Sequence, residues 1–292
     1  MGNRTCCSTR GDQGDKGNGM DAEALRRARE AADIFVKAWT SQSWINDSQS
    51  YPAPPLSIAE LYETHLAIQQ HPLSQTLLRG LGGYKLGAVG ALNQPCLYAP
   101  IFRRFFVEAD LKENLSVSAL QMHQVEPEFG VVLGIDLPSR SDGRLHRDED
   151  VWTAIESVVL CIECCGRRSK PDVANAQSPL GKFADCLSAG GVVLGKRLPR
   201  PQVSGPALAS CAVSFSVDGE VVGEGSGSNC AEKGPLPAVT WLANHLNSRG
   251  LALQRGQLVI TGATCNTKKF KPGSVLTADF EGLGRVQTTL MA

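Results

Sequence analysis

The stretch Val125-Glu126-Pro127-Glu128-Phe129-Gly130-Val131-Val132-Leu133 holds two carboxylates two positions apart in an otherwise apolar run. Side chains at i and i+2 share one face of a β-strand, so Glu126 and Glu128 are expected to point the same way. Neighbouring carboxylates repel each other unless a positive charge neutralises them, and a hard divalent cation with oxygen ligands does this economically. The alternative is an exposed edge strand, which Pro127 would suit. The spacing alone leaves both interpretations open.

Composition limits the class of protein. With 292 residues, 42% hydrophobic and 20% charged, the chain can form one or two packed globular domains. Its 29 basic residues equal its 29 acidic ones, so it has no electrostatic footprint for nucleic acid. We find neither an 18-residue apolar run nor a secretory signal, and expect a cytoplasmic protein. The ten cysteines, mostly in apolar contexts, are expected to be reduced, buried thiols.

The first seven residues suggest an alternative localisation. Gly2 meets the requirement for N-myristoylation, and Cys6 and Cys7 could be palmitoylated. Two lipid chains would tether the protein stably to a membrane surface. Cys6 stands where Ser or Thr is usual, and the other interpretation is an unmodified leader.

The chain divides into three parts that differ in composition and in the pattern of their apolar residues. Residues 1–20 are polar and rich in glycine, which predicts a disordered leader. Residues 21–79 predict a helical subdomain, with helices over Asp21–Thr40 and from an N-cap at Ser57 to about Gln70, where Glu60 is placed for a capping box.

Residues 80–292 alternate short apolar runs with turn residues, which predicts a β-rich catalytic domain. The expected strands cover Val131–Leu133, Val158–Ile162, Gly191–Leu194, Ala212–Val217, Leu258–Thr261 and Val275–Phe280. Asp218-Gly219 predicts a hairpin turn. Helices are expected at about Asp148–Ser157 and Pro235–Asn247.

Further polar residues could join the two glutamates. Glu163 interrupts an apolar strand, where a charge is costly unless it is paired or bound to metal, whereas Glu156 has a helical context and is expected to be solvated. Lys85 lies between glycines and could bind a carboxylate, transfer a proton or simply be a surface lysine. Asp185 is either a supporting acceptor or a turn residue. Among the histidines, His123 is nearest to the proposed site.

The remaining histidines and one pair of cysteines are less informative about function. His65, His71 and His146 are expected at the surface or in loops, and His245 is expected to pack on its helix. Cys161 and Cys164 form a C-x-x-C pair, but positions i and i+3 face opposite sides of a strand, which argues against a shared zinc ion.

Several segments, taken in order, resemble one family. They are GYKLG at 83–87, EPEFGVVL at 126–133, CIECCGRR at 161–168, FADCLSAGGVVLG at 183–195, DGEVVGEGSGSNC at 218–230, PLPAVTWLANHL at 235–246 and TGATCNTKKFKPGSVLTADFEGLGRV at 261–286. This set is similar to the 2-oxopent-4-enoate hydratase and 4-oxalocrotonate decarboxylase family of the fumarylacetoacetate hydrolase superfamily. The resemblance implies an α+β fold with a mixed β-roll or barrel core behind the N-terminal helices.

The resemblance also implies a set of site residues. A Mg²⁺ or Mn²⁺ ion would be held by Glu126, Glu128 and Glu163. Lys85 and Asp185 are the expected catalytic residues, with Ala184 and Asp185 at the start of a strand. The expected substrate-binding residues are Tyr84, Gly87 and Thr261.

The chain departs from the family pattern on the substrate side. A Ser/Thr-bearing patch is replaced by Ala88-Val89-Gly90-Ala91, and Ala-Asp-Asn becomes Ala184-Asp185-Cys186. Lys268 and Lys269 add two positive charges. Metal binding is therefore a safer prediction than the substrate.

The predicted activity is that of a metal-dependent hydratase, a lyase, acting on a 2-oxo or 2-hydroxy-alkenoate such as 2-hydroxypenta-2,4-dienoate. The metal would stabilise an enolate of the 2-oxo acid, and water would add to the far end of the unsaturated ketone. One alternative is a decarboxylase of a 2-oxo diacid of the 4-oxalocrotonate type, which Lys268 and Lys269 would favour if they line the pocket. The other is a non-catalytic metal-binding scaffold. A homo-oligomer is expected.

Overall fold

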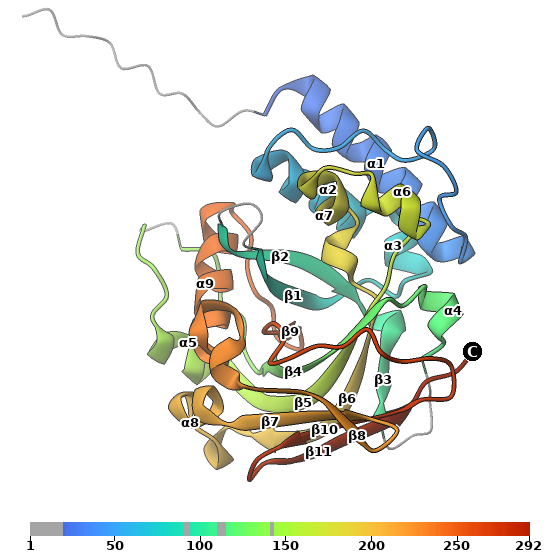
Figure 1. Cartoon of the computed structure of the whole chain (residues 1–292). Coiled ribbons are helices and arrows are strands. Elements are labelled where there is room, and N and C mark those ends of the chain that lie inside the picture. Colours follow the sequence, from blue (N-terminus) through green and yellow to red (C-terminus); the bar gives the residue numbers. More distant parts are fainter. Residues whose placement is uncertain (1–19, 90–93, 110–114, 141–142) are drawn as a thin grey trace, which may run out of the picture.

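The structure is a computed structural model that describes residues 20–89, 94–109, 115–140 and 143–292 (Figure 1). Its helices are α1 (Ala22–Ser41), α2 (Ile58–Gln70), α3 (Pro72–Thr76), α4 (Val117–Leu120), α5 (Asp148–Ala154), α6 (Pro171–Asn175), α7 (Pro179–Ala184), α8 (Gly205–Ser210) and α9 (Pro235–Ser248). Its strands are β1 (Leu81–Val89), β2 (Gln94–Phe102), β3 (Phe106–Glu108), β4 (Gln124–Leu133), β5 (Ile155–Cys165), β6 (Gly191–Pro199), β7 (Ala212–Val217), β8 (Glu220–Ser226), β9 (Leu258–Ile260), β10 (Val275–Phe280) and β11 (Gly284–Thr289).

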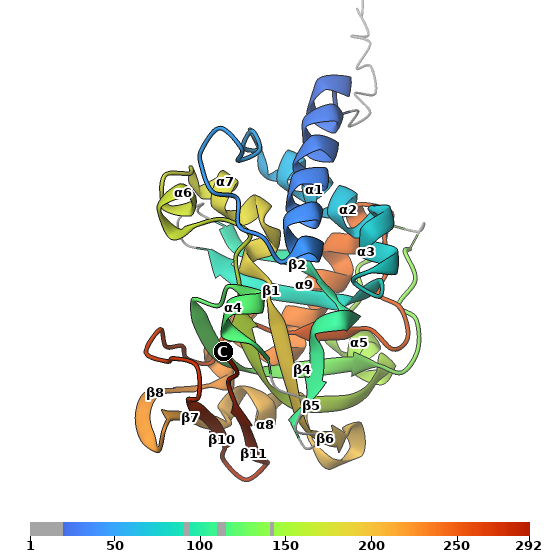
Figure 2. The ribbon, with the colours of Figure 1, turned by 90° about the vertical axis from the view of Figure 1, so that its right-hand side faces the viewer.

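Two sheets form the β-rich part. The larger has seven strands in the order β2-β1-β9-β4-β5-β6-β3 and is mixed, because β1 pairs with β9 and β3 with β6 in parallel. The smaller is antiparallel, in the order β11-β10-β7-β8. Figures 1 and 2 show the larger sheet curling, with the smaller sheet at the end away from α1. The predicted α+β fold with a mixed, curled core is confirmed.

Strand β4 occupies an internal position, between β9 and β5. The edge-strand interpretation of Glu126-Pro127-Glu128 is therefore wrong. Pro127 has no N–H to donate, but its carbonyl still accepts a hydrogen bond from the Thr264 N–H at 3.0 Å. The segment beside this end of β4 is a loop and not a regular strand. A loop can lie next to Pro127, whereas a regular neighbouring strand would need the backbone N–H that proline lacks.

Most predicted elements are present, with shifted boundaries. Strands β7 and β10 match the predicted ranges, and Asp218 and Gly219, both at positive φ, make the expected turn into β8. Helix α5 is shorter than expected, because the chain extends into β5 from Ile155. Glu156 is consequently on a strand and not on a helix, although it is exposed as predicted.

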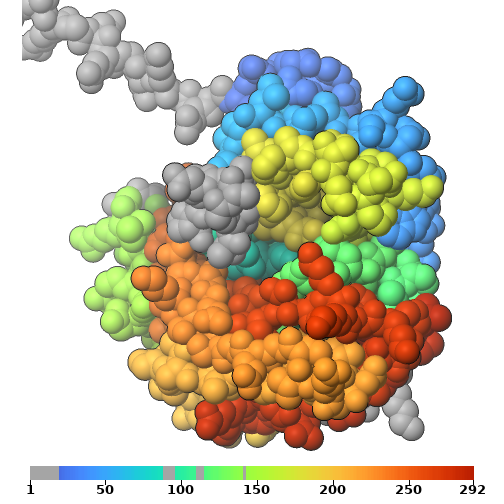
Figure 3. Space-filling view, viewed as in Figure 1, coloured from blue at the N-terminus to red at the C-terminus, as the bar shows by residue number. Residues whose placement is uncertain are grey.

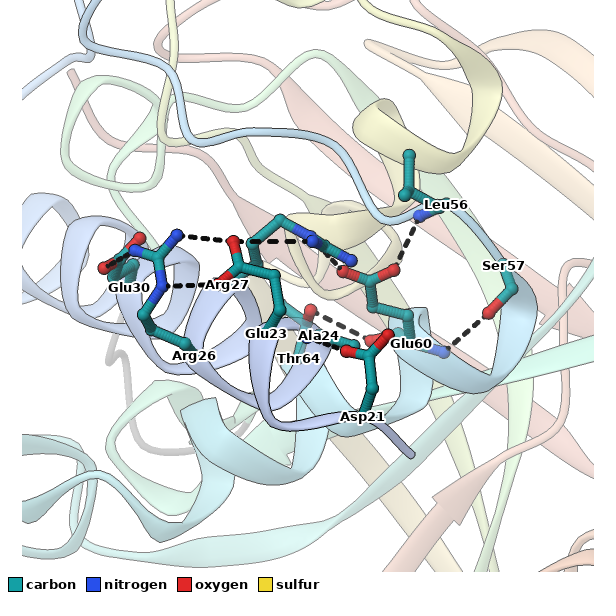
Figure 4. A network of polar contacts seen from close by, with 10 residues as sticks. All are labelled: Asp21, Glu23, Ala24, Arg26, Arg27, Glu30, Leu56, Ser57, Glu60 and Thr64. Carbon is teal, nitrogen blue, oxygen red and sulfur yellow. Dashed lines mark hydrogen bonds and ion pairs between the residues drawn. The ribbon is translucent and has the colours of Figure 1, made fainter. Parts of the chain in front are cut away.

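The N-terminal helices are tied to each other by polar contacts (Figure 4). Ser57 caps α2 as predicted by accepting from the Glu60 N–H at 3.1 Å. Only half of the capping box forms, because the Glu60 carboxylate accepts from the Leu56 N–H at 2.9 Å and not from Ser57. Its other oxygen accepts from Arg27 Nε on α1 at 2.8 Å. This nearly buried carboxylate therefore joins α1 to α2.

Helices α1, α2 and α7 lie on the β1–β2 side of the sheet in both views (Figures 1 and 2). Trp39 of α1 packs edge-on against Phe102 of β2, with ring centroids 5.4 Å apart. His65, expected at the surface or in a loop, is instead buried on α2. His146 lies in a loop, as the prediction allowed, but its side chain is buried. His65 contacts the carbonyls of Tyr98 and Phe183, so α2 is fixed to β2 and to the end of α7.

Two further expectations concern cysteines and membranes. All eight cysteines in the described part of the chain are free, and seven of them are buried, as predicted. Among the same residues, no helix combines the length and apolarity needed to cross a membrane. Gly2, Cys6 and Cys7 lie outside the described residues.

Candidate metal and substrate site

The register of β4 against β5 gathers acidic side chains on one face of the sheet. Glu126 lies directly opposite Glu163, and Gln124 lies opposite Cys165. Because the side-chain period of a strand is two, Glu128 shares the face of Glu126. Residues 37 and 41 positions apart in sequence thus become neighbours through antiparallel pairing.

Strand β1 brings a positive charge to this face. Lys85 Nζ lies 2.7 and 2.8 Å from the two carboxylate oxygens of Glu163, and both side chains are buried. Burial is the largest single influence and would lower the pKa of Lys85, but the negative charge of Glu163 and the smaller influences of Cys165, Glu126 and Glu128 together outweigh burial and raise the pKa. Lys85 is thus a charged residue of the site and not the surface lysine that its sequence context also allowed.

Glu128 is left with an unsatisfied oxygen. Its Oε2 accepts from the Gly262 N–H at 2.7 Å, whereas its Oε1 has no hydrogen-bond partner among the described residues. Burial, followed by the charges of Glu163 and Glu126, raises the pKa of this fully buried carboxyl. A buried carboxylate oxygen without a partner is costly, and a cation bound beside it would remove the cost.

The closest group of metal-ligating atoms differs from the predicted glutamate triplet. One ligand atom each from Glu126, Glu163 and Cys165 lies within 4.8 Å of the others, and Glu128 is not in this group. The Cys165 thiol contacts Glu126 Oε2 at 3.5 Å. Sequence reasoning missed Cys165, although its spacing of two from Glu163 on β5 places it on the same face.

Lys85, Glu126 and Cys165 line a cavity of about 470 Å³, whereas Glu128 and Glu163 are not among its lining residues. In Figure 3 the teal β1–β2 region is visible in a recess between the yellow, orange and red parts of the chain. The cavity is lined by Lys85, Leu86, Gly87, His123, Gln124, Glu126, Cys165, Phe183, Leu187, Ser188, Asn229, Ala231, Gly262, Ala263 and Asn266. Segments from six separate regions of the sequence therefore meet here.

His123 is in the cavity wall, close to the position that its sequence suggested. Burial, and then the positive charges of Arg167 and Lys85, lowers the pKa of His123 to about 3. Asn229, on a 3-10 turn, and Asn266, in a loop, also line the cavity. Both lie in segments that carry the family resemblance, but no role was predicted for either of them from the sequence.

Two of the predicted substrate-binding residues do not line the cavity. Tyr84 alternates with Lys85 along β1 and packs edge-on against Tyr98, with centroids 5.6 Å apart. Thr261 is fully buried, and its hydroxyl donates to the Phe129 carbonyl at 2.9 Å. Gly87, in contrast, lines the cavity, and a methyl group added there would meet no atom within 4 Å.

Asp185 is fixed by an arginine. Its Oδ2 accepts from the Arg168 N–H at 2.9 Å, its Oδ1 accepts from Arg168 Nε, and its carbonyl accepts from Arg168 Nη2 at 2.8 Å. Asp185 ends helix α7, whereas the expected strand begins only at Gly191. Its side chain faces a smaller neighbouring cavity of about 150 Å³.

Two of the departures from the family pattern concern Lys268 with Lys269 and the patch at residues 88–91. Lys268 and Lys269 are not among the residues that line the larger cavity, so the condition attached to the diacid alternative is not met. The side chains of the altered patch at residues 88–91 lie outside the described part of the structure.

Comparison with known proteins places this arrangement in a family. The profile of the fumarylacetoacetate hydrolase C-terminal family matches residues 107–291, which include β4, β5 and all three glutamates. The chain belongs to the fumarylacetoacetate hydrolase C-terminal family. Within it, the chain is 32% identical over 267 residues to 2-keto-4-pentenoate hydratase 1 of Dechloromonas aromatica, covering 88% of this chain and 95% of that protein.

A further relative and a solved structure are also similar to this chain. A 2-keto-4-pentenoate hydratase of Paraburkholderia xenovorans is 30% identical over 240 residues, which cover 80% of this chain and 84% of that protein. The fold matches 4-oxalocrotonate decarboxylase from Pseudomonas putida G7, complexed with magnesium and adipate, with a TM-score of 0.76 at 22% identity, covering 94% and 100% of the two chains. At that identity the structural match supports the fold alone.

Proposed function

We propose that this protein is a metal-dependent hydratase of a 2-oxo-4-alkenoate or its 2-hydroxydienoate tautomer, the class to which 2-hydroxypenta-2,4-dienoate belongs. The observation that carries the proposal is that Glu126 and Lys85 line one cavity while Glu163 pairs with Lys85 and lies opposite Glu126. The chain is also about 30% identical to several 2-keto-4-pentenoate hydratases. The reaction adds one water molecule across a carbon–carbon double bond, which makes the protein a lyase.

The residues fit a divalent cation. Glu126 and Glu163 supply carboxylate oxygens close together, and the partnerless Oε1 of Glu128 is the orphaned buried acceptor that a cation would satisfy. We propose Mg²⁺ or Mn²⁺ as the resident ion, because hard cations prefer oxygen ligands. Once bound, the ion would polarise the keto oxygen of the substrate and stabilise negative charge on it.

Lys85 is proposed to hold the substrate. Its ammonium group lines the cavity beside the carboxylates, where it can bind the substrate carboxylate or carry a proton between substrate carbon and oxygen. Gly87, in the same wall, leaves room for the substrate chain. Asp185, Tyr84 and Thr261 do not reach the cavity, and we assign them to the support of its walls.

The test is the loss of ultraviolet absorbance of 2-hydroxypenta-2,4-dienoate, with Mg²⁺ or Mn²⁺ and then with a chelator. The Glu128→Ala variant is compared with the Glu156→Ala variant, which removes an exposed glutamate. We expect metal-dependent turnover in the wild type and in Glu156→Ala, and none in Glu128→Ala. Absence of turnover in a wild-type protein that binds metal would refute the hydratase assignment.

A decarboxylase of a 2-oxo diacid is the second candidate, because 4-oxalocrotonate decarboxylase shares the fold of this chain. Release of CO₂ from a 2-oxo diacid, measured beside hydration of the monoacid, separates the two. A non-catalytic metal-binding scaffold would bind the ion and turn over neither acid.

Assembly and localisation are also proposals. The larger sheet ends on β2 and β3 and the smaller on β11 and β8, and such edges favour association into a homo-oligomer, which light scattering would reveal. A membrane tether through Gly2 predicts that Gly2→Ala moves the protein out of the membrane fraction. An unchanged distribution would refute the tether.

A further inference from the structure

Cys165 brings a sulfur atom to a site otherwise built of carboxylates. It follows Glu163 by two positions on β5, is buried, and lines the same cavity as Glu126 and Lys85. Its sulfur belongs to the closest group of possible metal ligands in the described part of the chain. The neighbouring Cys164 is also fully buried but points to the opposite face of the strand.

A second, independent feature points to a ligand at this face. Glu128 Oε1 is fully buried and has no hydrogen-bond partner among the described residues. Among the described residues, the Cys165 thiol makes a single hydrogen bond, which it donates to Glu126 Oε2 at 3.5 Å, and a thiol is a weak donor. The site thus contains both an unsatisfied oxygen and a weakly engaged sulfur.

Oxygen and sulfur ligands select different ions. Mg²⁺ takes oxygen ligands almost exclusively, whereas Zn²⁺ and Co²⁺ bind thiolate as well as carboxylate. A thiol beside two carboxylates therefore gives borderline ions one more ligand than Mg²⁺ can use.

We propose that Cys165 is a direct ligand of a borderline divalent cation such as Zn²⁺ or Co²⁺, together with Glu126 and Glu163. This inference rests on the proposed metal-dependent function and extends it to ion selectivity. Binding replaces the S–H bond by a metal–sulfur bond, and the released proton passes to solvent; no electron is transferred. Mg²⁺ would use the carboxylates of the same site and leave the thiol protonated.

The experiment is a titration of the metal-free protein with Co²⁺, followed by absorbance, because a thiolate bound to Co²⁺ gives a charge-transfer band in the near ultraviolet. We expect the band in the wild type and in the matched control Cys164→Ser, and its loss in Cys165→Ser. Calorimetry should show Co²⁺ affinity falling at least about tenfold in Cys165→Ser, while Mg²⁺ affinity is unchanged.

The Mg²⁺ measurement also establishes that Cys165→Ser is folded, and Cys165→Ala provides a second variant without a hydroxyl. Co²⁺ binding by the wild type without the band, or a band that persists in Cys165→Ser, would overturn the inference while leaving Mg²⁺-dependent hydration intact. If the wild type binds neither Co²⁺ nor Mg²⁺, the proposed metal-dependent function is wrong, and the assignment of Cys165 as a metal ligand is wrong as well.

Discussion

Lys85 and Glu163 form a buried ion pair in which the ammonium nitrogen lies 2.7 and 2.8 Å from both carboxylate oxygens. The pair joins β1 to β5 across the two strands between them, β9 and β4, and 78 positions separate its members in sequence. It places a positive charge against a glutamate that we assign to the metal. Folding stability and the proposed chemistry are therefore coupled at this contact.

Removal of the lysine is expected to destabilise the metal-free protein. In Lys85→Met, Glu163 is left buried beside Glu126 without a countercharge, and the free energy of unfolding should fall by about 3 kcal/mol. Urea denaturation with a chelator measures this loss, and added Mg²⁺ should recover part of it. An unchanged unfolding midpoint in the chelated variant would contradict the ion pair.

Asp185 is expected to act by positioning and not by proton transfer. In Asp185→Asn, the buried Arg168 loses its countercharge, which should cost about 3 kcal/mol of stability and disturb the nearby wall formed by Leu187 and Ser188. We expect kcat to fall while the shape of the pH–rate profile is unchanged. Loss of one limb of that profile would show that Asp185 transfers a proton itself.

Two glycines on β1 are expected to respond oppositely to an added methyl group. Gly83 has φ +151°, and a Cβ there would lie 1.8 Å from the Leu258 carbonyl oxygen of β9, so Gly83→Ala should lose more than about 3 kcal/mol. Gly87→Ala meets no neighbour and should keep wild-type stability, while the narrower cavity raises KM. Equal melting temperatures for the two variants would contradict this.

The buried His65 is expected to make the protein sensitive to acid. Burial outweighs the two carbonyls that contact its ring and lowers its pKa from 6.5 to about 4. Between these pH values the unfolded chain binds the proton and the folded chain does not, so the free energy of unfolding decreases as the pH falls. The full effect is about 3 kcal/mol. His65→Asn should flatten the slope in denaturation experiments across this range; an unaltered slope would show that His65 is already protonated in the folded state.

Predictions from local sequence patterns were correct for structural features that depend on residues close together in the chain. The period of two in β4 correctly placed Glu126 and Glu128 on one face, Asp218-Gly219 gave the hairpin, and Ser57 gave the start of α2. Each of these features depends on residues within a few positions of one another. Strands β1, β2, β3 and β11 were not predicted. Glycines interrupt β1 and prolines interrupt β2, whereas β3 has only three residues and β11 contains a single apolar residue, Val286.

The sequence by itself determined the family, the carboxylates that interrupt an apolar strand and most, but not all, of the sheet-forming segments. Only the tertiary structure decided that Lys85 forms an ion pair with Glu163 and that Asp185 forms one with Arg168. It also decided that the Cys165 thiol lies close to the carboxylates of Glu126 and Glu163. These contacts depend on strand order and register, which bring distant residues within a few ångströms. Such relations are set by the packing of the whole sheet, and no local spacing encodes them.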